Sequence, residues 1–378
     1  MAVIAPDPTG TPLLDIRDVD AQRLADITYA FVDLDGTCLD KKKVPSAGFW
    51  KAVHSFEETG GVIIPATGNA REAAFVKVRS ADASGCAVPE DRGGTGFGAS
   101  GADLGRLPGV YQNGAEVRGC GGEEISQTWL GSAVLERLLD WFNALSSDQR
   151  EQVGIAFQSY GNVYILAAPS PETSIPEAWT AARKDHPHVP RLEKWSRAPY
   201  YWGEGWAQSL EYGPLKERLL QSRVHCAMML TSATQQEQWA EDVLNALGDL
   251  SRNVYHCLGL SDPTPLDRSA YTFTHPDASK GNALRMLLRH FGDVAPRTVA
   301  AFGDNLNDKS MFLVEDVFGI AVQNAKEELK EVAKAQTAAH DDPQLAGVAL
   351  ALDRIAQARR GKAGSTAVPC PAKRRKLE

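Results

Sequence analysis

The chain has 378 residues, of which 43% are hydrophobic and 23% are charged, a composition typical of a globular protein with more than one core. Its formal net charge is -8, so it lacks the positive field that binding to nucleic acid or to an anionic membrane requires. No apolar run approaches the roughly 20 residues of a membrane-spanning helix, and the N-terminus lacks the pattern of a secretory signal. We therefore expect a cytoplasmic protein that binds neither nucleic acid nor membrane.

The cysteines are scattered, with no CxxC pair and no histidine at metal-ligand spacing. This disfavours both a disulfide framework and a zinc site, and we expect reduced thiols. The six cysteines are Cys38, Cys86, Cys120, Cys226, Cys257 and Cys370.

The first predicted elements are short apolar strands at 27–34 (ITYAFVDL) and 62–67 (VIIPAT), each followed by a helix-like stretch. The same alternation returns at 298–303 (TVAAFG) and 318–322 (FGIAV), which precede the helix-like segments MFLVEDV and AKEELKEVAKA. Such alternation predicts an α/β fold with a Rossmann-like parallel sheet and helices on both faces. The loops at the carboxyl ends of the strands would hold the ligand.

Residues 85–109 contain eight glycines, which disfavours a helix or an interior strand. We interpret this stretch as a flexible insert. A loop that cradles phosphate is the alternative, but no GKS or GKT follows it.

Between 119 and 265 the pattern changes, and we expect an inserted α+β cap domain. Its predicted helices lie at 131–145 and 235–248, and its predicted strands lie at 153–160, 162–168, 223–231 and 253–259. Five of its aromatic residues gather within 195–206 and either stack on a sugar or base or pack inside the cap. They are Trp195, Tyr200, Tyr201, Trp202 and Trp206.

The last segment, 359–378, is rich in Gly, Ser, Pro, Lys and Arg and has too little apolar surface to fold. We expect it to be disordered. Its sequence PAKRRKLE resembles a nuclear import signal that would bind an import carrier, and a solubilising or artificial extension is the alternative. A nuclear location therefore stays open beside the cytoplasmic one.

Two carboxylates, Asp33 and Asp35, end the first predicted strand in the sequence FVDLDGT. Asp33 can attack phosphorus as a nucleophile, while Asp35 protonates the leaving alcohol and then deprotonates water. Gly36 lets the chain turn sharply and brings backbone N–H groups near phosphate, and Thr37 can cap the next turn. A plain surface turn also fits DLDG, but the apolar strand before it disfavours that interpretation.

The sequence GDNLND at 303–308 also follows an apolar strand. Asp304 and Asp308, with Asn305 and Asn307, offer the hard oxygen ligands that suit Mg²⁺. A fragment of a calcium loop is the alternative, but its DxDxDG register and its glutamate are absent.

Two weaker signals complete the set. In ATGNAR, Thr67 and the N–H groups that follow it, from Gly68 on, are suited to hold a phosphate oxygen at a strand end. In SKGNAL, Lys280 stands at a helix start, where the helix dipole disfavours a cation unless an anion binds there.

In chain order, DLDGT, the threonine of ATGNAR, the lysine of SKGNAL and GDNLND resemble the four motifs of the haloacid dehalogenase-like hydrolase superfamily, in its Cof-type sugar-phosphatase branch. QNGAEV, IAVQNAKEELKEVA and LAGVALAL are similar to its weaker signatures. The resemblance covers 27–80 and 110–356. Asn69 departs from it, because the branch has arginine there, although Arg71 follows closely.

The pattern of elements and the resemblance together predict four parts of the chain. They are an N-terminal extension at 1–26, a hydrolase core at 27–118 and 266–358, a cap at 119–265 and the basic tail at 359–378.

The resemblance also implies the roles of single residues and Mg²⁺ as cofactor. Asp33 would be the nucleophile and Asp35 the acid and base, and Asp35 would offer its backbone carbonyl to Mg²⁺. Asp308 would support the metal shell or the lysine. The implied phosphate-binding residues are Gly36, Thr67, Gly68, Lys280 and Asn307, and the implied metal ligands are Asp33, Asp35, Asp304 and Asp308.

We therefore expect a Mg²⁺-dependent phosphatase that acts on a small phosphorylated metabolite, such as a sugar or polyol phosphate. An aspartate at position 35 indicates a phosphatase or a phosphomutase rather than a dehalogenase or a transport ATPase. A phosphomutase and a non-catalytic module that senses a phosphorylated ligand are the alternatives. The intact chemical positions disfavour the second of these.

Overall fold

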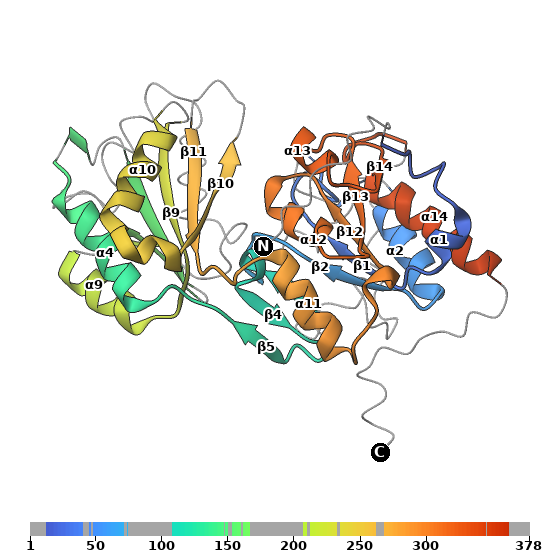
Figure 1. The fold of residues 1–378 in the computed structure, drawn as a ribbon, viewed down its shortest axis with the longest axis horizontal. Helices are drawn as coiled ribbons and strands as arrows, with labels where there is room; N and C mark the ends of the chain where they lie inside the picture. Colours follow the sequence, from blue (N-terminus) through green and yellow to red (C-terminus); the bar gives the residue numbers. More distant parts are fainter. Residues whose placement is uncertain are drawn as a thin grey trace, which may run out of the picture. The chain divides into compact units, whose positions relative to one another are not determined.

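The chain forms two compact units in the computed structural model (Figure 1). Unit 1 comprises 1–68, 75–127 and 279–378, and unit 2 comprises 69–74 and 128–278. The residues that the structure describes are 13–40, 45–46, 48–71, 74, 108–146, 148–149, 153–159, 162–166, 207–209, 212–232, 235–261, 268–344 and 346–362.

Unit 1 is built on a five-stranded parallel sheet with the order β14-β13-β12-β1-β2. The three central strands are short, apolar and buried along their whole length, as expected of a sheet covered on both faces. The strands are β1 (Tyr29–Val32), β2 (Val62–Pro65), β12 (Val299–Gly303), β13 (Phe318–Val322) and β14 (Ala335–Thr337). The predicted α/β core with a parallel sheet is confirmed.

Helices cover this sheet (Figure 1). One group, in which α14 packs on both α1 and α2, lies on one side, and the pair α11 and α12 lies on the other. The helices are α1 (Ala21–Ala25), α2 (Phe49–Glu58), α11 (Lys280–His290), α12 (Lys309–Phe312), α13 (Glu327–Lys330) and α14 (Gly347–Gly361).

A small antiparallel sheet belongs to the same unit. Its strands are β3 (Gly109–Tyr111), β4 (Glu116–Arg118) and β5 (Glu124–Gln127). The turn between the first two strands is the 3₁₀ segment Gln112–Gly114. Because Ala66 bridges Val110 in parallel, this turn is brought to the carboxyl end of β2.

Unit 2 is a six-stranded sheet with the order β10-β11-β9-β6-β7-β8, and helices α4, α9 and α10 lie on one side of it (Figure 1). Leucine, valine and aromatic side chains of these helices form one buried core with β6, β9 and β11. The helices are α4 (Ser132–Ala144), α9 (Tyr212–Gln221) and α10 (Gln236–Leu247). The strands are β6 (Gly154–Ser159), β7 (Asn162–Leu166), β8 (Ala207–Ser209), β9 (Val224–Ser232), β10 (Tyr255–Ser261) and β11 (Arg268–Thr274).

The limits of the two units differ from the sequence-based ones. The inserted part of unit 2 runs from 128 to 278 rather than from 119 to 265, because β4 and β5 pair with β3 in unit 1 while β11 pairs with β9 in unit 2. The described part of the predicted N-terminal extension, 13–26, also belongs to the core, since Ile16 N donates to Gln336 O at 2.7 Å and Asp15 bridges β14.

The predicted tail begins too early, at 359. Arg359 lies inside α14 and is 3% exposed. Its guanidinium donates to the carbonyls of Ile27 (2.6 Å) and Thr59 (2.7 Å), so it ties the last helix to the core. The rest of the tail from 363 on, most of the glycine-rich insert and the aromatic cluster at 195–206 lie outside the described residues.

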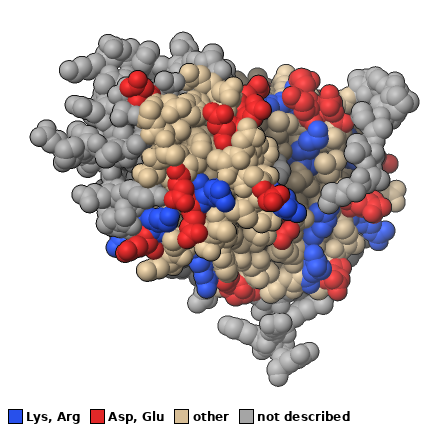
Figure 2. Space-filling model, turned by 60° about the vertical axis from the view of Figure 1, so that its left-hand side comes forward, with Lys and Arg blue, Asp and Glu red and all other residues tan. Residues whose placement is uncertain are grey.

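Charge is mixed on the face shown in Figure 2, where Lys and Arg alternate with Asp and Glu and neither sign forms a continuous field. Among the described helices, none combines the length and apolar composition of a bilayer-spanning segment.

Candidate active site

Asp33 stands directly after β1, at the carboxyl end of the sheet. Its N–H donates to Phe302 O of β12 at 3.2 Å, and the residue is 5% exposed. The next residues form a tight turn in which the N–H groups of Cys38 and Leu39 point to the carbonyl of Leu34, at 3.1 and 2.9 Å. The adjacent ends of β1 and β12 therefore fix the position of the Asp33 carboxylate.

Gly36 makes this turn possible in two ways. Its φ of +83° lies in the left-handed region, which favours glycine. A Cβ at this position would also collide with the carboxylate of Asp304, so the absence of a side chain lets two loops meet. The Gly36 carbonyl accepts a hydrogen bond from Asn324 Nδ2 at 2.8 Å, and Asn324 Oδ1 accepts one from His340 N at 2.9 Å. Asn324 thus joins the loops that follow β1, β13 and β14.

Lys280 lies between two carboxylates. Its Nζ is 2.6 Å from Asp33 Oδ1 and 2.6 Å from Asp308 Oδ1, and its side chain is fully buried. Burial alone would lower the pKa of Lys280, but the charges and hydrogen bonds of Asp308 and Asp33 outweigh it and raise that pKa above its usual range. Lys280 is therefore a fixed cation at the sheet edge.

The segment before and after Lys280 explains its position. Ser279 caps α11 by accepting a hydrogen bond from Asn282 N at 3.1 Å. Gly281 lies against the backbone of Ser310, where a Cβ would collide with the Ser310 carbonyl. This close approach brings the first turn of α11 next to the loop that carries Asp308.

Asp308 also organises its own loop. Its Oδ2 accepts hydrogen bonds from the N–H groups of Asp304 (3.0 Å) and Asn305 (3.1 Å), which closes the turn after β12. Burial raises the pKa of Asp308 to about 6, and the charge of Lys280 opposes that rise. Asp308 therefore helps to fix the position of the Lys280 ammonium group and the conformation of the loop after β12.

Three carboxylates could hold a metal ion. Asp33, Asp304 and Asp308 each offer one oxygen, and these oxygens lie within 4.8 Å of one another. Burial and the charges of Asp33 and Asp308 hold the pKa of Asp304 well above its usual range. Thr37 Oγ1 lies 3.0 Å from Asp33 Oδ2 and 3.2 Å from Asp304 Oδ1. Such crowded carboxylate oxygens fit a hard divalent cation such as Mg²⁺.

Asp35 lies outside this cluster of carboxylates and is half-buried in the turn that contains Gly36. Its place, two residues beyond Asp33 on the same turn, fits the sequence-based division into a nucleophile and an acid.

The remaining predicted residues meet at Asn113. Thr67, which is 1% exposed, donates through its N–H to Val110 O at 2.8 Å, and its carbonyl accepts from Asn113 N at 3.0 Å. Asn307 Nδ2 donates to Asn113 Oδ1 at 3.0 Å. Gly68 faces the same amide, since a Cβ there would lie 3.1 Å from Asn113 Oδ1.

The structure thus brings every predicted site residue to one edge of unit 1 and adds three. The three added residues are Thr37, Asn113 and Asn324. The sequence predicts Thr37 only as a cap, and it places Asn113 and Asn324 only within the family signatures QNGAEV and IAVQNAKEELKEVA. The dipeptide NG at 113–114 is a turn signal, but it does not reveal that the turn contacts a loop 194 residues away.

Three cysteines whose side chains the structure describes, Cys38, Cys120 and Cys226, form no disulfide. Cys38 is fully buried beside the turn that carries Asp33, and burial with the nearby charges of Asp33 and Asp35 raises the pKa of its thiol well above the usual range. A buried, protonated thiol is disfavoured as a nucleophile.

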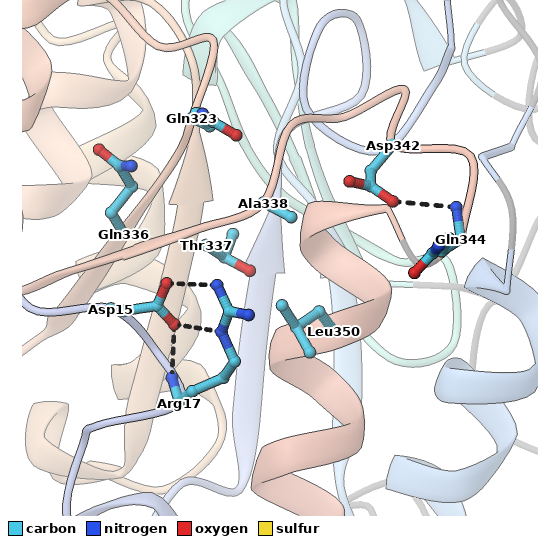
Figure 3. A pocket seen from close by; sticks show the side chains of 9 residues that line it. All are labelled: Asp15, Arg17, Gln323, Gln336, Thr337, Ala338, Asp342, Gln344 and Leu350. Carbon is cyan, nitrogen blue, oxygen red and sulfur yellow. Dashed lines mark hydrogen bonds and ion pairs between the residues drawn. The ribbon is translucent and has the colours of Figure 1, made fainter.

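A separate polar pocket of about 360 Å³ lies beside β14 (Figure 3). Among its described lining residues the one cation is Arg17, whose Nη2 pairs with Asp15 Oδ2 at 2.8 Å. It contains none of the predicted site residues and lacks an unmatched positive charge for phosphate. The lining residues are Asp15, Arg17, Gln323, Gln336, Thr337, Ala338, Asp342, Gln344 and Leu350.

Some known proteins are similar to this chain in sequence, and others are similar to it in fold. The chain is 25% identical over 349 residues to the chloroplastic endoribonuclease YBEY of Arabidopsis thaliana, a match that covers 90% of this chain and 49% of that protein. It is 44% identical over 73 residues to a putative phosphatase of Haemophilus influenzae, which covers 19% of this chain and 27% of that protein. The chain therefore spans about half or less of the length of these relatives.

Among solved structures, a sugar phosphatase of HAD subclass IIB is similar over 86% of this chain and 97% of that chain, with a TM-score of 0.55 and 16% identity. This likeness supports the fold. The family model described as haloacid dehalogenase-like hydrolase matches residues 100–352. Because that match covers well over half of the chain, and because the four motifs meet at one site, the protein belongs to the haloacid dehalogenase-like hydrolase family.

Proposed function

We propose that this chain is a Mg²⁺-dependent phosphatase that hydrolyses a small phosphomonoester by way of a phosphoryl group carried on Asp33. The observation that carries the proposal is the buried arrangement of Asp33, Lys280, Asp308 and Asp304 at the carboxyl edge of the parallel sheet. A carboxylate that is held by a lysine beside two further acids suits transfer of a dianionic group.

The proposed reaction has two steps. In the first, a carboxylate oxygen of Asp33 attacks phosphorus, the ester P–O bond breaks, and Asp35 gives its proton to the leaving alcohol. In the second, water attacks the phosphorus, Asp35 takes the proton, and the bond from phosphorus to Asp33 breaks. Inorganic phosphate leaves, and both aspartates return to their starting states.

The other residues position and neutralise the phosphoryl group. Lys280 holds Asp33 and supplies positive charge, and Asp308 holds Lys280. Mg²⁺, held by Asp33 and Asp304 with the Asp35 carbonyl, would neutralise negative charge on the transferring group when bound. The N–H groups after Thr67 and in the Gly36 turn would bind phosphate oxygens.

A sugar or polyol phosphate is the proposed substrate class. The fold likeness to a sugar phosphatase supports this class, and the mixed charge on the face in Figure 2 gives no support to a polyanionic substrate such as nucleic acid. The name endoribonuclease belongs to a plant protein of which this chain matches only 49%, and we do not extend that activity to this chain.

The test is phosphate release from sugar, polyol and nucleotide monophosphates and from an aryl phosphate, with Mg²⁺ or with EDTA. We expect Mg²⁺-dependent turnover that falls on the order of 10³-fold or more in Asp33→Asn, which keeps the shape of the side chain but removes its charge. Asp18→Asn makes the same change at an exposed residue and should keep full activity.

Equal inactivity of the wild type and Asp33→Asn across the panel would contradict the proposal. Phosphate transfer between hydroxyls without net release would indicate a phosphomutase. Ligand binding without any turnover would indicate a sensing module.

A further inference from the structure

The turn Gln112–Gly114 contacts three of the four motif segments. Asn113 N donates to Thr67 O at 3.0 Å, and Asn113 Oδ1 accepts from Asn307 Nδ2 at 3.0 Å. Gly114 lies against the backbone of Ser279, the residue before Lys280, where a Cβ would collide with the Ser279 carbonyl. The turn therefore touches the segments that carry the phosphate-binding threonine, the lysine and the metal-binding loop.

The backbone of this turn is unusual. Gln112 and Asn113 have φ values of +50° and +56°, and Gly114 follows at +99°, so three successive residues lie in the left-handed region. Residues other than glycine seldom adopt it, and asparagine is among those that tolerate it best. A conformation of this kind persists only where the surrounding contacts determine it, and it often marks a functional site.

The side chain of Asn113 fixes the amide of a neighbouring loop. Within the described residues, Asn307 Oδ1 is buried without a hydrogen bond, so the bond from Asn307 Nδ2 to Asn113 Oδ1 is the contact that orients the Asn307 amide. The Asn113 amide also lies against Gly68, where a Cβ would be 3.1 Å from Oδ1 and 3.3 Å from Nδ2. One amide thus sets the geometry of two elements proposed to bind phosphate.

We propose that Asn113 is a positioning residue for recognition of the substrate phosphate, acting through Asn307 and the Thr67–Gly68 turn. This inference rests on the proposed phosphatase function. It deepens that function because it assigns to a residue outside the four motifs the task of holding two phosphate-binding segments together. The effect of losing the Asn113 side chain should therefore fall on phosphate affinity.

Asn113→Gly is the variant that isolates the side chain. Glycine adopts positive φ without strain and keeps the N–H that donates to Thr67, so only the amide contacts are removed. We expect inorganic phosphate to bind up to about 10-fold more weakly to the Mg²⁺-loaded variant in isothermal titration, the size of one lost hydrogen bond between neutral groups. KM for an aryl phosphate should rise by a similar factor.

Asp293→Gly is the matched control. Asp293 is exposed and has a φ of +54°, so the change again replaces a left-handed residue by glycine, but away from the site. It should leave phosphate affinity and KM as in the wild type.

Two further variants separate positioning from a general structural role. Asn307→Ala leaves the turn intact and should weaken phosphate binding as Asn113→Gly does. In the double variant, Asn113→Gly should add less than about 3-fold to the loss from Asn307→Ala, because interacting residues are not additive. Wild-type phosphate affinity in either single variant, or full additivity in the double variant, would overturn the inference.

The two proposals fail in different ways. A wild type that neither hydrolyses phosphate esters nor binds inorganic phosphate would refute the phosphatase function itself. A wild type that does both, together with an unaffected Asn113→Gly, would refute the role of Asn113 alone.

Discussion

Both units bury an apolar core, but in the described residues the cluster of buried carboxylates and its lysine lies in unit 1. At the edge of the sheet in unit 1, Lys280 and Asp308 are fully buried and Asp33 is 5% exposed. In unit 2 the described core is apolar, with residues such as Leu139 and Phe157 fully buried, and the described residues form no carboxylate cluster there. Charges are costly to bury unless they are paired, whereas apolar side chains gain free energy on burial. The free energy cost of burying charge therefore falls on unit 1, where each buried charge has a partner, whereas burial in the described core of unit 2 is mainly apolar.

The largest expected effect comes from removing the buried cation. Lys280→Met leaves Asp33 and Asp308 buried without their partner, which typically costs about 3–5 kcal/mol of stability. We expect this loss in urea unfolding with EDTA present, and phosphate release should fall to background. Lys334→Met, at an exposed lysine, is the control. A stable and active Lys280→Met would show that the buried carboxylates of unit 1 do not need this cation.

The second effect tests the packing of unit 2. Leu139→Ala should create a cavity in the apolar core and cost about 2–5 kcal/mol, measured as a lower urea midpoint for the unfolding of unit 2. Mg²⁺ affinity should stay unchanged, because the carboxylates lie in unit 1. If titration calorimetry showed that Leu139→Ala also weakens Mg²⁺ binding, packing in unit 2 and metal binding in unit 1 would not be independent.

The third effect is a pH-dependent response to metal. The pKa of Asp308, about 6, and that of Asp304 are both raised in the folded protein. The metal-free folded state therefore holds more protons than the unfolded chain between about pH 4 and 6, so its stability falls as pH rises through this range. At 100 times its Kd, Mg²⁺ should stabilise the protein by about 2.7 kcal/mol at pH 7.5. Because Mg²⁺ competes with those protons, the stabilisation by the same Mg²⁺ concentration should be smaller at pH 5.5.

Thermal unfolding with Mg²⁺ or EDTA at the two pH values measures this response. Asp304→Asn should abolish most of the stabilisation by Mg²⁺, whereas Asp18→Asn, at an exposed residue, should leave that stabilisation unchanged. An equal shift in Tm at pH 5.5 and pH 7.5 would argue against metal binding by these carboxylates.

The smallest effect concerns the close approach of two loops. Gly36→Ala places a side chain at a φ of +83° and against Asp304, so we expect a cost of about 1–2 kcal/mol from the backbone alone and a further loss of kcat/KM. Gly292→Ala has a φ of +96° with no atom within 4 Å of its Cβ, and it should show the backbone cost without the loss of activity. Equal kcat/KM values for the two variants would show that the contact with Asp304 has no role.

Much of the site could be predicted because its residues follow strands. Asp33 and Asp304 each come directly after an apolar run, and the carboxyl ends of parallel strands meet at one edge. Lys280 could be predicted because a cation at a helix start is unfavourable unless an anion lies nearby, and the structure supplies Asp33 and Asp308. These signals are local in sequence.

What could not be predicted depends on contacts that are remote in sequence. The run AKEELKEVAKA is rich in helix formers, but α13 ends at Lys330, and Lys334 N donates to Gly319 O at 2.8 Å as the chain enters β14. Pairing with β13 overrides the local helix propensity there. The composition of 359–378 assigns Arg359 to the basic tail. Its hydrogen bonds to the carbonyls of Ile27 and Thr59, which are remote in sequence, place it in a buried part of α14.

Detection of a phosphoryl group on Asp33 tests the proposed mechanism most directly. Enzyme in excess over an aryl phosphate, with Mg²⁺, would be quenched in acid and reduced with borohydride, which converts an acyl phosphate to homoserine. If Asp33 carries the phosphoryl group, peptide mass spectrometry should find homoserine at position 33, and none in a sample without substrate. Turnover with Asp33 unmodified, or with the modification at another residue, would contradict the proposed mechanism.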